Sequence, residues 1–177
     1  MSESERARQL DPLSLIIATD QGAILYYSRQ YDRAIDQFHV VIAMEPNFAR
    51  AHMVTLPYVE KGMFQEALAD TQSSQSNDTR AEESQAYIYA RSGDMLKAER
   101  ALATAKQVRA GRIDALNLTV VQAYVAMGKK EEAISVLQTA YREHSNLVTS
   151  LKVDPAFDPL RGDPRFQELL RHIGLGQ

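Results

Sequence analysis

Tyr124-Val-Ala-Met-Gly-Lys-Lys-Glu-Glu-Ala-Ile-Ser-Val-Leu137 is the stretch of sequence that decides the fold, because its spacing recurs along the chain. Within it a tyrosine stands four residues before a glycine, and the glycine stands five residues before an alanine. The alanine position is filled at Ala34, Ala67, Ala98 and Ala133, at intervals of 33, 31 and 35 residues. A spacing that returns at this period predicts a row of similar, stacked structural units.

Glycine and tyrosine keep their places in three of the four copies. The glycines are Gly62, Gly93 and Gly128, and the tyrosines are Tyr58, Tyr89 and Tyr124. We expect the glycine to end the first helix of a hairpin, since a left-handed backbone angle costs glycine little. Alanine suits the closest approach of two helices, because a larger side chain would overpack the contact. Apolar residues recur at three- and four-residue spacing, so each unit is predicted to be a pair of helices.

Eight helices in four hairpins follow from this register. The predicted ranges are 13–28 and 31–44, 48–61 and 64–75, 80–92 and 95–107, and 113–127 and 130–143. Pro57 lies inside the third range and is expected to kink that helix, because proline removes a backbone hydrogen bond.

The C-terminal segment contains three aspartates that each precede a proline: Asp154, Asp158 and Asp163. Such steps suit turns and helix starts, because aspartate accepts bonds from free amides and proline fits the first helical position. A short helix is predicted over about 164–172, followed by Gly174 as its stop signal. Four apolar side chains of this segment are expected to cover the last hairpin: Phe166, Leu169, Leu170 and Ile173.

The repeat resembles the tetratricopeptide repeat (TPR), whose period is about 34 residues. The first copy carries the signature glycine, alanine, aromatic and proline, at Gly22, Ala34, Phe38 and Pro46. The resemblance covers roughly residues 10 to 143. It implies an all-α fold, a right-handed superhelical solenoid of about four TPR helix hairpins with a C-terminal capping helix. The second copy departs from the pattern at Thr55 and Thr71. Its two helices are therefore expected to pack least tightly of the four hairpins.

A single domain is expected over residues 1–177. The repeats are assigned to 13–47, 48–78, 79–112 and 113–145, and the C-terminal cap to 146–177. Residues 1–12 are interpreted as the remnant or cap of a preceding repeat, because Leu10-Asp-Pro resembles the Met44-Glu-Pro that closes the first complete copy. Ser2 and Glu5 have the spacing of a capping box at the start of that remnant.

The run from Leu151 to Leu175 is similar to the ends of C-terminal TPR regions in bacterial multidomain signalling proteins. Those proteins include winged-helix transcriptional regulators, serine/threonine kinases and adenylate cyclases. The resemblance implies a regulatory context and a chain cut from a longer protein. The alternative is a native half-repeat that caps the N-terminal end.

Composition excludes several classes of function. The formal net charge of −3 argues against a nucleic-acid-binding surface, which would need a basic excess. No apolar run approaches the roughly 20 residues that span a bilayer. The polar start lacks the apolar stretch of a secretory signal, so we expect a cytoplasmic protein, or a periplasmic one if the chain follows a membrane span. The chain has no cysteine, which removes disulfides and zinc–thiolate sites.

No pattern of catalytic or metal-binding residues is visible. The four histidines, His39, His52, His144 and His172, have no partner at the three- or four-residue spacing of metal-binding helices. The aspartates of the C-terminal segment lack the spacing of a calcium loop. Neither a phosphate-binding glycine loop nor a serine elbow is present. We therefore expect no enzyme, no metal and no cofactor.

The resemblance implies that the first helices of the hairpins line a concave face that binds a protein or peptide. Carried over copy by copy, the face comprises Tyr26, Tyr27, His52, Leu56, Arg80, Tyr87, Arg91, Leu118 and Gln122. Aromatic side chains suit such a face, because they offer large contact area at small entropic cost. The alternative is that some of these tyrosines pack between helices instead.

The sequence favours a protein-interaction scaffold that binds a peptide or helix on this face, as a regulatory module of a larger bacterial protein. The alternative function is a structural or oligomerisation element that packs on its own copies, as a homodimer for example, or on a parent output domain. An exposed N-terminal flank would then be the adhesive surface.

Overall fold

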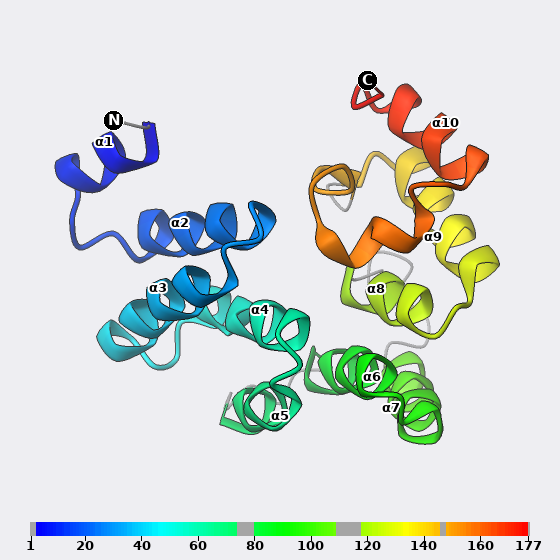
Figure 1. Ribbon diagram of the computed structural model, residues 1–177, viewed down its shortest axis with the longest axis horizontal. Coiled ribbons are helices and arrows are strands. Elements are labelled where there is room, and N and C mark those ends of the chain that lie inside the picture. The colour runs from blue at the N-terminus through cyan, green and yellow to red at the C-terminus, as the bar shows by residue number, and fades with distance from the viewer. Residues whose placement is uncertain (1–2, 74–79, 109–117, 146–147, 177) are drawn as a thin grey trace. The chain divides into compact units, whose positions relative to one another are not determined.

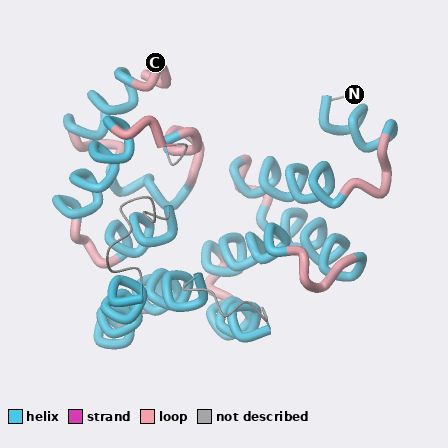
Figure 2. The backbone as a smooth tube through the Cα atoms, turned by 180° about the vertical axis from the view of Figure 1, so that it is seen from behind, coloured by secondary structure: helices cyan, strands magenta, loops and turns pink. Residues whose placement is uncertain are grey.

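The structure, a computed structural model, describes residues 3–73, 80–108, 118–145 and 148–176. Every regular element in those ranges is a helix, and no strand occurs there (Figure 2). The chain divides into two compact units, Met1–Asn77 and Asp78–Gln177. None of the described helices is both long and apolar enough to cross a membrane.

The first unit holds two hairpins preceded by a short helix (Figure 1). Helix α1 (Glu3–Leu10) leads to α2 (Leu15–Tyr27), which packs on α3 (Tyr31–Met44). The second hairpin joins the 3-10 helix η1 (Ala49–Val54) and α4 (Thr55–Glu60) to α5 (Phe64–Ser73). Both η1 and α4 pack on α3, so the two hairpins stack within the unit. Ser2 of the predicted capping box lies outside the described residues.

The second unit holds the other two hairpins and the C-terminal segment (Figure 1). Its helices are α6 (Arg80–Ser92), α7 (Met95–Val108), α8 (Leu118–Ala126), α9 (Lys130–Arg142), the 3-10 helix η4 (Pro155–Leu160) and α10 (Pro164–His172). Helix α6 packs on both α7 and α8, and α8 packs on α9. The predicted start of the helix over 113–127 falls on residues that are not described. The predicted all-α array of helix hairpins with a C-terminal capping helix is confirmed.

The repeat alanines and the residues that face them form the core of each hairpin. Ala34, Ala67, Ala98 and Ala133 are all fully buried. In the first hairpin Gly22 lies against the ring of Phe38, which is also fully buried. A Cβ atom built on Gly22 would stand 2.8 Å from Phe38 Cε1, so this position has no space for a side chain. The signature glycine of the first copy is therefore required by close helix packing.

The hairpin turns use the left-handed backbone conformation. Gly62, Gly93 and Gly128 have φ angles of 74°, 88° and 74°. Arg29 takes the same place after α2 with φ of 61°, and its amide donates to the carbonyl of Tyr26. The first copy thus adopts the turn of the other three without their glycine, at the steric cost that a side chain brings to this conformation.

Arg29→Gly is expected to stabilise the first unit by about 0.5–1 kcal/mol, because it removes the Cβ that disfavours a left-handed backbone. The reverse change, Gly62→Arg, should destabilise by a similar amount. Thermal unfolding followed by circular dichroism measures both. A fall in the midpoint for Arg29→Gly would contradict this interpretation of the turn.

Pro57 lies in the first turn of α4, and the helix predicted over 48–61 consists of two elements that meet before it. The segment begins as the 3-10 helix η1 and becomes α-helical only at Thr55, two residues before the proline. The two residues that depart from the repeat pattern are both buried. The Thr55 hydroxyl donates to Asp70 Oδ2 at 2.7 Å, and the Thr71 hydroxyl donates to the carbonyl of Leu68. His52 Nδ1 lies 2.9 Å from Asp70 Oδ1, so Asp70 links both helices of the hairpin.

The C-terminal segment caps the last hairpin. Asp154 and Asp163 accept hydrogen bonds from the amides of Ala156 and Arg165, so both begin helices as predicted. Asp158 instead pairs with Arg161 at 2.7 Å. Phe166, Leu169 and Leu170 are buried, and Ile173 is half-buried. Because η4 packs on α8 and α10 packs on α9, the segment takes the place of a shortened fifth hairpin.

An exposed ion-pair cluster joins α10 to α9. Arg165 bonds both Asp163, at 2.8 Å, and Glu131, at 3.2 Å. The Arg165 side chain, which donates hydrogen bonds to Asp163, lowers the pKa of that carboxyl to about 2. Because the pKa of this carboxyl is lower in the folded chain than its ordinary value of 3.8, its ionisation stabilises the folded state at a pH above 3.8. This contribution is lost as the pH falls through about 2.

Candidate functional site

The predicted binding face can be compared between repeats, because each of its positions recurs at a fixed distance before the repeat alanine. One position lies eight residues before it, at Tyr26, Val59, Ala90 and Val125. These four residues are exposed by 0%, 1%, 4% and 5%. The position is therefore a core position in every repeat. Tyr26 packs between helices, with its ring centroid 5.2 Å from that of Tyr27 and 6.1 Å from that of Tyr31.

The next position along each first helix is accessible. It lies seven residues before the alanine and is occupied by Tyr27, Glu60, Arg91 and Ala126, all of which are half-buried. Partial exposure at the same position in all four repeats marks the edge of the first-helix face that solvent or a partner can reach. We call these four residues the accessible stripe.

A third position differs between the two units. It lies eleven residues before the alanine, where Ala23 and Leu56 of the first unit are half-buried. The equivalent Tyr87 and Gln122 of the second unit are exposed by only 1% and 2%. Arg91 lies one turn after Tyr87 and donates from its guanidinium to the Tyr87 hydroxyl at 2.9 Å. Tyr87 thus anchors Arg91 from within the core.

Gln122 is covered by the C-terminal segment. Its side-chain amide donates to Asp154 Oδ2 at 2.9 Å, and Asp154 is exposed by only 1%. The other oxygen of Asp154 accepts from the amide of Ala156. The segment therefore occupies the part of α8 to which the sequence assigned a partner. Gln122 and Asp154 are 32 positions apart in the sequence, so no local pattern could have predicted this contact.

The remaining predicted residues are dispersed. His52 and Leu118 are half-buried at equivalent positions, fifteen residues before the alanine. His52 is bonded to Asp70 as described above, which orients its ring. The side chain of Arg80 lies outside the described part of the structure.

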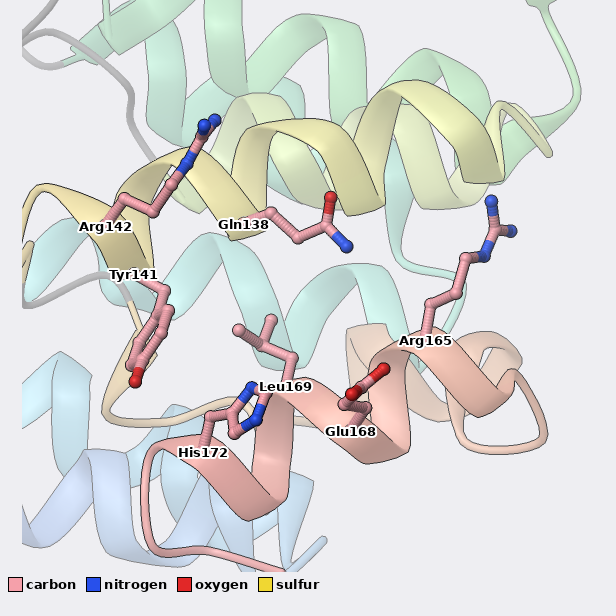
Figure 3. A pocket seen from close by; sticks show the side chains of 7 residues that line it. All are labelled: Gln138, Tyr141, Arg142, Arg165, Glu168, Leu169 and His172. Carbon is pink, nitrogen blue, oxygen red and sulfur yellow. The ribbon is translucent and has the colours of Figure 1, made fainter.

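A groove lies elsewhere on the second unit, between α9 and α10 (Figure 3). It encloses about 400 Å³ and is lined by Gln138, Tyr141, Arg142, Arg165, Glu168, Leu169 and His172. The rings of Tyr141 and His172 stack across it, 5.9 Å apart and at 14°. The lining mixes both signs of charge, and Arg165 is held in the ion-pair cluster. These residues do not form a catalytic constellation. Among the described residues no group of histidine, aspartate and glutamate could hold a metal ion.

Comparison with known proteins supports the fold assignment. No protein-family model and no curated protein sequence matches the chain. A solved structure that does match is YrrB, described as a TPR protein with an unusual peptide-binding site. The two chains align over 96% of this chain and 90% of YrrB, with a TM-score of 0.51 and 15% sequence identity. The chain thus has the fold of TPR proteins, and this similarity concerns the fold alone.

Proposed function

We propose that this chain is a protein-interaction scaffold that binds a peptide or helix along the faces of its first helices. The observation that carries the proposal is the accessible stripe, in which one position of every first helix stays partly open: Tyr27, Glu60, Arg91 and Ala126. Within each unit, where two hairpins stack, this position offers a ligand one contact per repeat. YrrB, which has the same fold, has a peptide-binding site, and this is consistent with such a role.

The chemistry of the stripe defines what it would bind. In the first unit Tyr27 and Leu56, both half-buried, present aromatic and aliphatic surface, which suits an apolar anchor of the ligand. In the second unit Arg91 presents a guanidinium that Tyr87 holds in place, which suits a carboxylate. We therefore expect the first unit to take an apolar side chain of a ligand and the second unit to take an acidic one.

Tyr27→Ala and Arg91→Ala are expected to weaken peptide binding by at least about tenfold each, because each removes one anchor. Peptides selected from a random display library would be titrated into the wild-type chain and the variants by calorimetry. Tyr26 and Tyr87 are unsuitable for this test, because both are core residues whose truncation would disturb folding. Lys97→Ala, on the second helix α7, is the control that should leave affinity unchanged. Selected peptides that bind both stripe variants like wild type would refute the assignment.

We further propose that the scaffold is a regulatory module within a larger bacterial signalling protein. The basis is the similarity of the run from Leu151 to Leu175 to the ends of the repeat regions of such proteins. Reading the gene upstream of the codon for Ser2 tests this. Coding sequence that continues into a kinase, cyclase or DNA-binding domain would support it, and a free-standing reading frame would contradict it.

A further inference from the structure

The groove between α9 and α10 contains a carboxylate that the fold does not pair. Glu168 lines the groove from α10, and its side chain forms no ion pair or hydrogen bond with any residue that the structure describes. Arg165 and Arg171 stand three residues before and after it, at a spacing that allows pairing on a helix. Neither arginine is used in this way, so the acceptor oxygens of Glu168 remain available to a ligand.

The charge at this end of the groove favours a cation. The Arg165 guanidinium bonds Asp163 at 2.8 Å and Glu131 at 3.2 Å, so it is already matched by two carboxylates. Glu168 and this cluster together place three carboxylates against one guanidinium. The resulting net negative charge attracts a positively charged group.

An anion is the poorer occupant. The second arginine that lines the groove is Arg142, and its guanidinium is turned away from α10 (Figure 3). It donates to the hydroxyl of Thr139 at 3.0 Å. Because Arg165 is engaged as well, neither of the two lining arginines directs an unpaired charge into the groove. An anion placed there would meet the carboxylate of Glu168 without a compensating cation.

The other lining residues suit a cationic group on an aliphatic chain. Leu169, which is exposed by only 4%, extends from α10 toward α9 and forms an apolar floor (Figure 3). The exposed side-chain amide of Gln138 supplies a second acceptor, its carbonyl oxygen. The stacked rings of Tyr141 and His172 close one end with aromatic surface. The volume of about 400 Å³ is sufficient for a small ligand.

We propose that this groove binds an aliphatic cation, an ammonium or guanidinium group on a short methylene chain. Glu168 pairs with the cationic head, Gln138 accepts one of its N–H bonds, and the methylene chain packs over Leu169. Basic side chains of a protein partner and free small amines share this chemistry. The groove lies between α9 and α10, whereas the accessible stripe lies on the first helices, so this site does not depend on the proposed peptide binding.

Titration of the isotopically labelled full chain with agmatine, a free amine that carries a guanidinium, tests the proposal. We expect saturable amide shifts in the parts of α9 and α10 that line the groove, with a dissociation constant of about 1 mM. Glu168→Gln preserves the shape of the side chain but removes its charge, and should raise that constant about fivefold or more. The matched control is Glu143→Gln, which removes an exposed carboxylate outside the groove and should leave the constant unchanged.

A second ligand distinguishes the two sources of the cation. Nα-acetylarginine methylamide carries the same guanidinium on a peptide backbone. Saturation by both ligands would assign the groove to a basic side chain of a protein partner, and saturation by agmatine alone would assign it to free amines.

Three outcomes would overturn the proposal. The first is the absence of saturable shifts with agmatine up to about 20 mM. The second is an equal response to the uncharged 1-pentanol, which would show that the groove binds apolar chains only. The third is unchanged agmatine binding in Glu168→Gln. Tyr27→Ala should bind agmatine like wild type, so failure of this site and failure of the accessible stripe are separate results.

Discussion

Gly22→Ala is expected to destabilise the first unit by about 1–3 kcal/mol, although alanine is by itself the better helix former by about 1 kcal/mol. The reason is the contact with Phe38, whose ring lies 2.8 Å from where the new Cβ would stand. The ring is fully buried, so it cannot move aside into solvent. Chemical denaturation followed by circular dichroism measures the change, and hydrogen exchange of α2 and α3 shows that it occurs in the first hairpin.

Gly162→Ala is the matched control, since a Cβ at Gly162 meets no atom within 4 Å. Its effect should stay within about 0.5 kcal/mol. Phe38→Leu combined with Gly22→Ala should recover part of the loss, because leucine withdraws the ring carbons that clash, and the double-mutant cycle measures this coupling. Equal stability of wild type and Gly22→Ala would show that the helices do not approach as closely as described.

Asp154→Ala is expected to destabilise the second unit by about 2–4 kcal/mol. The change removes the cap of η4, worth about 0.5–2 kcal/mol, and leaves the buried amide of Gln122 without this acceptor, at about 1–3 kcal/mol. Hydrogen exchange of the α8 amides is the readout, because α8 is the helix that η4 covers.

Asp163→Ala is the comparison for that prediction. Asp163 also caps a helix, yet its other partner is the exposed Arg165. Its loss should cost only about 0.5–2 kcal/mol and should leave α8 exchange unchanged. If the two variants were equally stable, Asp154 would be a cap alone and the Gln122 link would contribute nothing.

Most of the fold could be predicted from the sequence, because the determinants are local and repeated. The alanine period placed the hairpins, and the glycines placed their turns. Asp154 and Asp163 marked helix starts because an aspartate before proline suits that position. The turn at Arg29 carried no glycine signal, and its conformation follows from the hairpin geometry that the other copies share.

The site could be predicted only in part, because the sequence gives the helix but not the side of it that is covered. Helix α2 is apolar almost all round, so its pattern did not distinguish Tyr26 in the core from Tyr27 at the surface. Tyr87 and Gln122 are likewise buried where the sequence predicted binding residues. Which of these side chains are buried depends on packing between helices that are distant in the sequence, and a local pattern does not contain it.

The most direct test of the proposed binding face is an amide chemical-shift map of the isotopically labelled chain titrated with a selected peptide. We expect the largest shifts along the first helices α2, α4, α6 and α8, around Tyr27, Glu60, Arg91 and Ala126. Shifts confined to the second helices α3, α5, α7 and α9, or to the groove between α9 and α10, would contradict it.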